Sequence, residues 1–440
     1  MSATLVGLLG IGLFFLFLIL RMPIAYAMTL SGFLGFSWLV SPEAAFRVVS
    51  KDLYATFSSY SLSVIPMFIF MGFLAFYSGI GARLFTFAYR TLGHFPGGLA
   101  IATQATCALF GAVCGSNTAT AATIGAIAIP EMKKYRYADT LSTASVAAGG
   151  ALGVLFPPSV IFIVYGMATE QSIGKLFIAG IIPGFLLLFL YMAVICIVAG
   201  RNPDLGPPGP VFSWKDRFAA LKGGIWEVFV IFSLSLGGLF AGWFTPTEAG
   251  AVGAAGVFFL TLIQGKLNWE GLKHALADST RTSAMIMLLV AGAVIFGRFM
   301  AVSRIPFELA TWAGQLDLPA YVVMALILLI YLVLGFFIDA LALVLLTIPI
   351  FYPVVVTVLG YDPIWFGVIM VLIVAMGVIT PPVGMNVYIV KGIAADVPLE
   401  TIFRGIWPFL AALIVCIVIL MIFPGLTTFL PGLIQPGGGA

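Results

Sequence analysis

The chain has 440 residues, of which 62% are hydrophobic and only 8% are charged. A soluble domain carries about 25% charged residues because its surface faces water, so the composition excludes a soluble globular protein and indicates an integral membrane protein. The 20 Lys and Arg nearly balance the 17 Asp and Glu, which leaves no basic field that could attract nucleic acid.

Apolar segments that approach the length of a membrane span follow one another along the first 200 residues. A span needs about 20 apolar residues to cross a hydrocarbon core of about 30 Å. The first segment, 5–20, has no preceding Lys or Arg and no small-residue cleavage pattern, so we interpret it as a retained helix and not a secretory signal. The other spans are expected at 24–40, 64–79, 141–170 and 176–199.

Two connecting segments in this half, 42–57 and 80–92, mix cationic and aromatic residues. The second has the pattern of an interfacial amphipathic helix, and such helices could brace a fixed frame. Ordinary connecting loops are the alternative.

The segment 98–129 is expected to form a re-entrant hairpin. Two arms of about 15 residues would each reach about 22 Å, which is short of a full crossing. Its middle reads GAVCGSNTATAATIG from Gly111 to Gly125, and five of the eight residues at 116–123 carry a hydroxyl or amide group.

Residues 201–224 are the most polar and proline-rich stretch of the chain, which predicts a linker. The segment 320–353 corresponds to the hairpin of the first half but is longer, so a hairpin and a pair of spans both remain open. The spans of the second half are expected at 225–243, 247–264, 283–300, 364–394 and 405–423.

Short motifs recur at a nearly constant offset, which indicates two homologous halves. Matching residues 223 to 225 positions apart are Pro23 and Pro246, Ser78 and Ser303, Pro96 and Pro319, Pro157 and Pro381, and Gly180 and Gly405. Each half has an odd number of crossings whether or not its hairpin crosses, so the second half is inverted. We therefore predict an all-α polytopic membrane protein with inverted repeats at 1–200 and 225–440. Inverted repeats with interrupted helices are typical of secondary transporters.

Proline pairs interrupt two predicted spans at equivalent positions, from Gly153 to Ser159 and from Gly377 to Gly384. The freed carbonyls could coordinate a cation such as sodium, and the following half-helix could offer N–H groups to an anion. A simple proline kink is the alternative for one isolated break. Two breaks at equivalent positions favour a paired ion site.

The polar hairpin tip is expected beside the first break, where its oxygens would suit a hard cation. Close packing of small polar residues between helices is the alternative. In the second half, Asp339 stands alone among apolar residues, 223 positions after Ser116. A carboxylate at mid-membrane costs about 2.5–3.5 kcal/mol on insertion scales, so an ion, a proton or a donor should compensate it. Asp339 could instead only cap the second hairpin arm.

Five ordered motifs extend over essentially the whole chain: GAVCGSNTATAATIG, GGALGVLFPPSVIFIVYG, FTPTEAGAVGA, LGFFIDALA and GVITPPVGMN. Together they resemble the large membrane subunit of a TRAP transporter, the tripartite ATP-independent periplasmic family. The resemblance implies a sodium-driven importer of an organic acid, such as a C4-dicarboxylate or a sialic acid, with an elevator-type fold in the bacterial inner membrane. It also implies a periplasmic substrate-binding protein and a small four-helix membrane subunit, expected here as a separate chain.

The resemblance further implies at least two sodium sites and a substrate site. The first sodium site would use Cys114, Ser116, Asn117, Gly153, Phe156 and Pro157. Cys114 would act through its backbone carbonyl, because a thiol is a poor sodium ligand. The second site would use Gly335, Gly377, Thr380 and Val383, together with Asp339. The substrate would meet Ser116, Asn117, Thr118, Pro158, Pro382 and Asn386. Arg298, near a span end, is expected to snorkel to the interface.

Other classes of function fit less well. The chain has no HExxH, GxGD or GxSxG motif for intramembrane proteolysis, its two histidines lie in connecting segments, and its four cysteines lack CxxC spacing. An ion channel is opposed by the paired broken helices. A stand-alone sodium-coupled carboxylate carrier of the same wider superfamily, which needs no binding protein, remains open.

Overall fold

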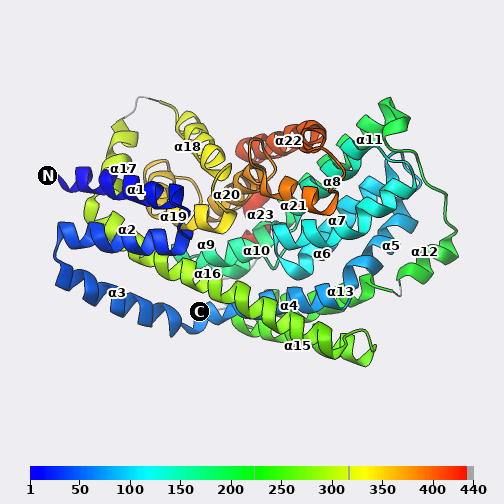
Figure 1. The fold of residues 1–440 in the computed structure, drawn as a ribbon, viewed down its shortest axis with the longest axis horizontal. Helices are drawn as coiled ribbons and strands as arrows, with labels where there is room; N and C mark the ends of the chain where they lie inside the picture. Colours follow the sequence, from blue (N-terminus) through cyan, green and yellow to red (C-terminus); the bar gives the residue numbers. More distant parts are fainter. Residues whose placement is uncertain (222, 316–317, 434–440) are drawn as a thin grey trace.

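The computed structural model describes residues 1–221, 223–315 and 318–433, and the regular elements in these ranges are all helical (Figure 1). A helix satisfies its backbone hydrogen bonds within one segment, as hydrocarbon requires. Six helices of the described chain are long and apolar enough to cross a membrane, and a seventh span results if the bent pair Trp214–Leu221 and Ile225–Phe240 is counted. The prediction of an all-α polytopic membrane protein is confirmed.

One group of helices, which we call the scaffold, packs around the longest helix, α16 (Trp269–Ser303). Its other members are α1 (Ala3–Ile19), α2 (Ile24–Leu39), α3 (Pro42–Phe57), α4 (Val64–Tyr77) and α15 (Pro246–Ile263). α16 contacts α2, α3 and α4, and Figure 1 shows it running diagonally past them. It begins well before the predicted span at 283–300 because Asn268 caps it, accepting a hydrogen bond from the Gly271 N–H at 2.7 Å.

A second group, which we call the core group, contains the hairpins and the broken helices. Its first half consists of α6 (Gly98–Cys114), α7 (Asn117–Lys134), α8 (Asp139–Leu152) and α9 (Val160–Thr169). Its second half consists of α18 (Ala320–Gly335), α19 (Ala340–Tyr352), α20 (Pro363–Gly377) and α21 (Met385–Ile393). The structure has a helix pair, α6 and α7, at the predicted hairpin, and the helices are interrupted at both predicted breaks. That the first pair is re-entrant stays a prediction. The division into inverted repeats with a linker at 201–224 stays a prediction.

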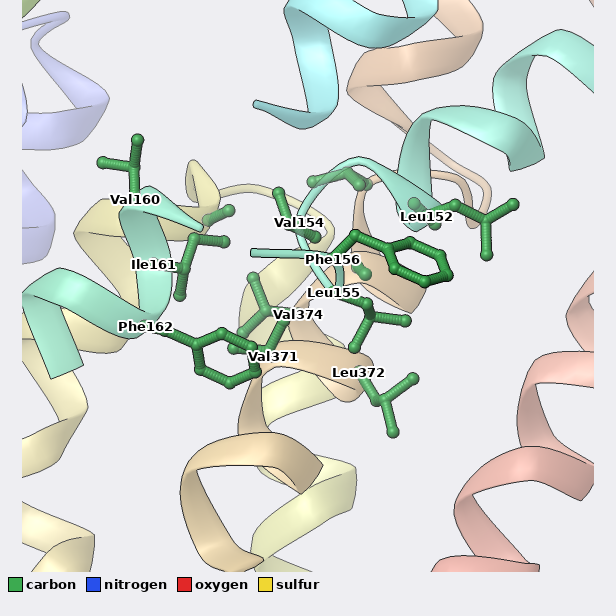
Figure 2. Packing of buried hydrophobic residues seen from close by; sticks show 14 of the residues in the cluster. Leu152, Val154, Leu155, Phe156, Val160, Ile161, Phe162, Val371, Leu372 and Val374 are labelled. Carbon is green, nitrogen blue, oxygen red and sulfur yellow. The ribbon is translucent and has the colours of Figure 1, made fainter. Parts of the chain in front are cut away.

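Buried apolar side chains hold the two broken helices together. Figure 2 shows Leu155, within the first break, and Phe162, in α9, beside Val371 and Leu372 of α20. All four side chains are buried. Because apolar contacts of this kind are lost when helices separate, they keep α9 and α20 packed together.

The remaining elements connect or flank these two groups. They are η1 (Tyr60–Ser63), α5 (Ile80–Leu92), α10 (Ile173–Ala179), α11 (Ile181–Arg201), η2 (Pro203–Leu205), α12 (Trp214–Leu221), α13 (Ile225–Phe232), η3 (Ser233–Gly237), α14 (Gly238–Phe240), α17 (Ile305–Gln315), η4 (Pro353–Val358), α22 (Leu399–Ile422) and α23 (Gly425–Gly432). Segments 42–57 and 80–92 form helices α3 and α5, so the alternative of ordinary loops is wrong.

The polar stretch 201–224 is bonded to the base of the first hairpin. The Gly97 N–H donates to the Gly206 carbonyl at 2.9 Å. The Tyr137 hydroxyl donates to the Pro207 carbonyl at 2.8 Å and accepts from the Leu99 N–H at 3.1 Å. Burial raises the pKa of Tyr137 to about 12, so its hydroxyl remains a donor in mildly alkaline solution as well as at neutral pH. These bonds fix the hairpin base to the stretch that joins the two halves.

Candidate functional site

The first hairpin turns at Gly115 and Ser116. Gly115 has a φ of 61°, and Ser116 caps α7 with its hydroxyl, which accepts from the Ala119 N–H at 3.3 Å. A Cβ atom on Gly115 would lie 1.8 Å from the Pro158 carbonyl oxygen. Only glycine fits there, so the hairpin tip rests directly on the first break.

In each half, a hairpin arm crosses a broken helix at a pair of glycines, which we call a glycine crossing, and the two crossings lie at equivalent positions. A Cβ atom on Gly111 would lie 2.6 Å from the Cα of Gly153, and one on Gly377 would lie 2.9 Å from the Cα and the carbonyl oxygen of Gly335. The two pairs are related by 224 residues, since 111 corresponds to 335 and 153 to 377. Each pair lets the first arm of a hairpin approach a broken helix at backbone distance.

Carbonyl groups are left free at both breaks. No backbone N–H of the described residues donates to the carbonyl oxygens of residues 153–158 or 379–383. Residues 153–158 are buried, whereas residues 380–383 are partly or fully exposed. Buried carbonyls nearly always have a hydrogen-bond partner, so the first run needs another explanation. Several carbonyl and hydroxyl oxygens in one place are the ligands that a hard cation prefers.

Sequence reasoning missed one oxygen at the first tip, the hydroxyl of Thr120. A Cβ atom on Gly153 would lie 2.4 Å from this hydroxyl and 2.9 Å from the Ser116 carbonyl oxygen, so both oxygens face the break. The Cys114 thiol lies 3.2 Å from the same hydroxyl and hydrogen-bonds with it inside the hairpin. The four-residue spacing of Ser116 and Thr120, which places both on one helix face, is the signal that could have found Thr120.

Asn386 connects the second break to the first hairpin. Its amide Nδ2 donates to the Asn117 Oδ1 at 2.6 Å and to the Ala147 carbonyl at 3.0 Å, and its backbone N–H donates to the Val378 carbonyl at 3.0 Å. Both asparagine side chains are buried. A Cβ atom on Gly150 would lie 2.5 Å from the Asn386 Nδ2, so the pair requires glycine there.

The second tip carries Asp339 at the start of α19. Its carboxylate accepts a hydrogen bond from the Leu341 N–H at 3.1 Å, so Asp339 caps this helix. In the adjacent break, the Thr380 hydroxyl donates to the Met376 carbonyl at 2.6 Å, and its lone pairs remain able to bind a cation.

One cavity of about 500 Å³ brings the two tips and the two breaks together. The hairpin tips contribute Ser116, Asn117, Thr118 and Asp339, among other residues, and the breaks border it at Val154, Val160 and Val378. Three predicted substrate contacts, Pro158, Pro382 and Asn386, are not among its lining residues. The Phe156 ring packs against Phe185 with ring centres 5.2 Å apart, so its side chain serves packing.

The opposite wall of this cavity belongs to the scaffold. α4 contributes Tyr77, and α16 contributes Asp278 and Thr282. The Tyr77 hydroxyl donates to the Asp278 Oδ2 at 2.5 Å. The cavity therefore lies between the core group and the scaffold.

A second cavity of about 540 Å³ also lies between these groups, lined by α3, α9, α16 and α19. It contains Arg298, whose Nε donates to the Asp52 Oδ2 at 3.0 Å. The Asp52 carboxylate is buried, whereas the Arg298 side chain is 60% exposed. Arg298 thus balances a buried charge in addition to reaching outward.

Comparison with known proteins agrees with this arrangement. Residues 11–426 match the family described as the tripartite ATP-independent periplasmic transporter, DctM component. The chain is 36% identical to the C4-dicarboxylate TRAP transporter large permease protein DctM of Pseudomonas aeruginosa, over 89% of this chain and 91% of that protein. It is 32% identical to the sialic acid TRAP transporter large permease protein SiaM of Vibrio cholerae, over 94% of this chain and 95% of that protein.

A solved structure with the same fold is that of the YdaH transporter of Alcanivorax borkumensis. It matches with a TM-score of 0.62 and 16% identity, over 87% of this chain and 89% of that chain. At this identity the likeness establishes the fold alone. From the family match over most of the chain, together with two broken helices and two hairpins around one cavity, we conclude that the protein is a multi-pass membrane permease and belongs to the DctM family of TRAP transporter components.

Proposed function

We propose that the chain is the large transmembrane subunit of a sodium-driven importer of an organic acid. One observation carries this proposal: both hairpin tips and both helix breaks border a single cavity. Secondary transporters bind cargo and coupling ions at discontinuous helices of this kind, because the freed carbonyls and N–H groups replace water as ligands.

Sodium is the proposed coupling ion. At the first site, the carbonyls of Gly153, Phe156 and Pro157 would act together with oxygens of Ser116 and Asn117. The free carbonyls at this break support the assignment.

At the second site, Gly335, Gly377, Thr380 and Val383 would act together with the Asp339 carboxylate. The described residues contain no group of three or more His, Cys, Asp or Glu side chains that could hold a metal. A site built from carbonyl and hydroxyl oxygens instead suits a hard cation such as sodium.

A carboxylate is the proposed cargo. The N-terminus of α7, which has 18 residues, presents backbone N–H groups and the hydroxyls of Ser116 and Thr118 at the cavity. Such helix starts attract anions. The relatives named for C4-dicarboxylate and for sialic acid support the same class of cargo.

An elevator movement of the core group against the scaffold is the proposed mechanism. The cavity is lined by both groups, so sliding one group past the other would carry its contents across the membrane. A Cβ atom on Gly72 of α4 would lie 2.9 Å from the Cα of Cys114. Because Gly72 has no side chain, the first tip lies close to the scaffold and no side chain at this position interdigitates with it.

Two partners belong to this proposal. They are a small four-helix membrane subunit, as a separate chain, and a periplasmic substrate-binding protein that delivers the acid to this chain in the bacterial inner membrane. The description of the family as tripartite and periplasmic supports both.

The test is uptake of a labelled acid into proteoliposomes that contain this chain and its small subunit. An inward sodium gradient is applied with and without the binding protein. We expect uptake only when both the gradient and the binding protein are present. Sodium-driven uptake without the binding protein would favour a stand-alone carrier, and uptake independent of sodium would contradict the proposed coupling.

A further inference from the structure

We infer that the cargo is a monocarboxylate with an apolar body, whose far end carries either no charge or a hydrogen-bond donor, and is not a dicarboxylate. This inference rests on the proposed function, because it assumes that the cavity of about 500 Å³ between the tips and the scaffold holds the acid.

Most of the large side chains that line the cavity, on both of its walls, are apolar. They include Phe73, Phe76, Phe110, Met285 and Met385. A bound molecule that buries a hydrocarbon portion here gains about 25 cal/mol for each Å² of apolar surface removed from water. A short dicarboxylate offers little such surface, and its second carboxylate would have to lose water against these side chains.

The charges at the cavity oppose a second negative group. Its described lining residues include two carboxylates, Asp278 and Asp339, and no Lys, Arg or His. The basic residues that flank Asp278 on α16, His274 and Arg281, do not line the cavity. Asp339 lies at the proposed second sodium site, where a cation can balance it.

Asp278 lies on the scaffold wall, across from the tips that would hold the carboxylate of the cargo. One of its oxygens accepts from the Tyr77 hydroxyl, and the other can accept from the cargo. A hydroxyl or ammonium group at the far end would meet this oxygen favourably. A carboxylate at the same place would be repelled.

A matched series of five-carbon acids tests this inference. Pentanoate, 5-aminopentanoate and glutarate have the same carbon count and differ only at the far end. The full chain, purified with its small subunit in detergent, is titrated with each acid in sodium and in potassium, and the shift of the apparent melting temperature is followed. We expect sodium-dependent stabilisation by pentanoate and 5-aminopentanoate, and half-saturation by glutarate at a concentration at least about tenfold higher.

The variant Asp278→Asn keeps the acceptor for Tyr77 and removes the charge. It should improve the affinity for glutarate relative to pentanoate by about tenfold, since like charges a few ångström apart in a protein site repel by at least the ~1.4 kcal/mol that a tenfold change represents. Glu270→Gln is the matched control, because Glu270 lies on the same helix, pairs with Lys273 and does not line the cavity.

The outcomes separate the two proposals. Glutarate binding as tightly as pentanoate, or a ratio unchanged by Asp278→Asn, would overturn the inference and leave sodium-coupled acid transport intact. No sodium-dependent stabilisation by any of the three acids, together with no sodium-driven acid uptake in proteoliposomes, would overturn the proposed function and the inference with it.

Discussion

Asn386 is a buried amide that joins parts of the core group from both halves of the chain. Replacing it with Leu removes the donor to Asn117 and to the Ala147 carbonyl and leaves both acceptors buried. Such a loss costs about 1–3 kcal/mol. We expect Asn386→Leu to lower the apparent melting temperature in detergent and to weaken stabilisation by sodium. Tyr388→Phe, on the same helix and half exposed, should change neither. Equal sodium responses of the wild type and Asn386→Leu would show that this bridge does not support an ion site.

Thr380 offers the only side-chain hydroxyl within the second break, among the residues from 377 to 384. Thr380→Ala should raise the sodium concentration needed for half-maximal uptake severalfold while the protein remains folded, because one hydroxyl ligand is lost. Thr86→Ala is the control, since its hydroxyl also donates to a carbonyl four residues earlier but lies on the exposed side of α5. The sodium titration of uptake is the measurement. An unchanged titration curve for Thr380→Ala would remove this residue from the proposed site.

At this scale the sequence predicted residue types better than residue roles. Ser116, Asn117, Thr118 and Asp339 line the cavity as their polarity in apolar surroundings suggested. Asn386 turned out to be bonded to Asn117, and Thr120 to lie beside Cys114. The Asn386 contact depends on how helices distant in the sequence pack, which spacing along one helix does not show, whereas the position of Thr120 could have been found from its spacing to Ser116.

Glycine crossings determine how closely the hairpins approach the broken helices. Gly111→Ala would place a Cβ atom 2.6 Å from the Cα of Gly153, so the helices must separate. Overpacking of this kind costs about 1–3 kcal/mol. We expect a lower melting temperature and reduced sodium-dependent uptake. Gly256→Ala on α15, where no heavy atom lies within 4 Å of the added Cβ, is the control. Normal sodium-driven uptake by Gly111→Ala would mean that this close approach is not needed for transport.

The contact between the stretch 201–224 and the first hairpin can be tested at Tyr137. Tyr137→Phe leaves the Pro207 carbonyl without its donor and the Leu99 N–H without its acceptor, which should cost about 1–2 kcal/mol locally. Hydrogen exchange at the backbone amides of Gly97 and Leu99 should become faster. Tyr54→Phe, at an exposed site, is the control. Unaltered exchange in Tyr137→Phe would show that the hairpin base is held by other contacts.

At the scale of elements, sequence patterns located the hairpin and both breaks to within a few residues, because proline pairs and polar residues are unusual in apolar segments. The length of α16 was predicted poorly. Its first turns carry the charged residues Lys273, Asp278 and Arg281, so they do not stand out as an apolar run. The start of the helix is instead set by the N-cap Asn268. The expectation of a simple linker also missed the hydrogen bonds that tie residues 206 and 207 to the first hairpin.

For the whole molecule, the arrangement of two groups around shared cavities is the result that matters most. The scaffold supplies one wall of the cavity, with Asp278, and the core group supplies the tips and breaks. A repeat in the sequence predicted that equivalent breaks exist, and the paired glycine crossings at an offset of 224 residues agree with it. Only the family resemblance implied that both breaks contribute to one site, since the spacing of residues does not show how one half docks against the other.

The most direct test of the central claim is the number of sodium ions that the purified chain binds. Radioactive sodium is titrated onto the protein in detergent, with the double variant Thr380→Ala and Ser116→Ala as comparison. We predict at least two ions for each chain and clearly weaker binding by the double variant, because each break presents its own run of free carbonyls. Binding of one ion or none, or a titration that the double variant leaves unchanged, would contradict the proposal of paired sodium sites.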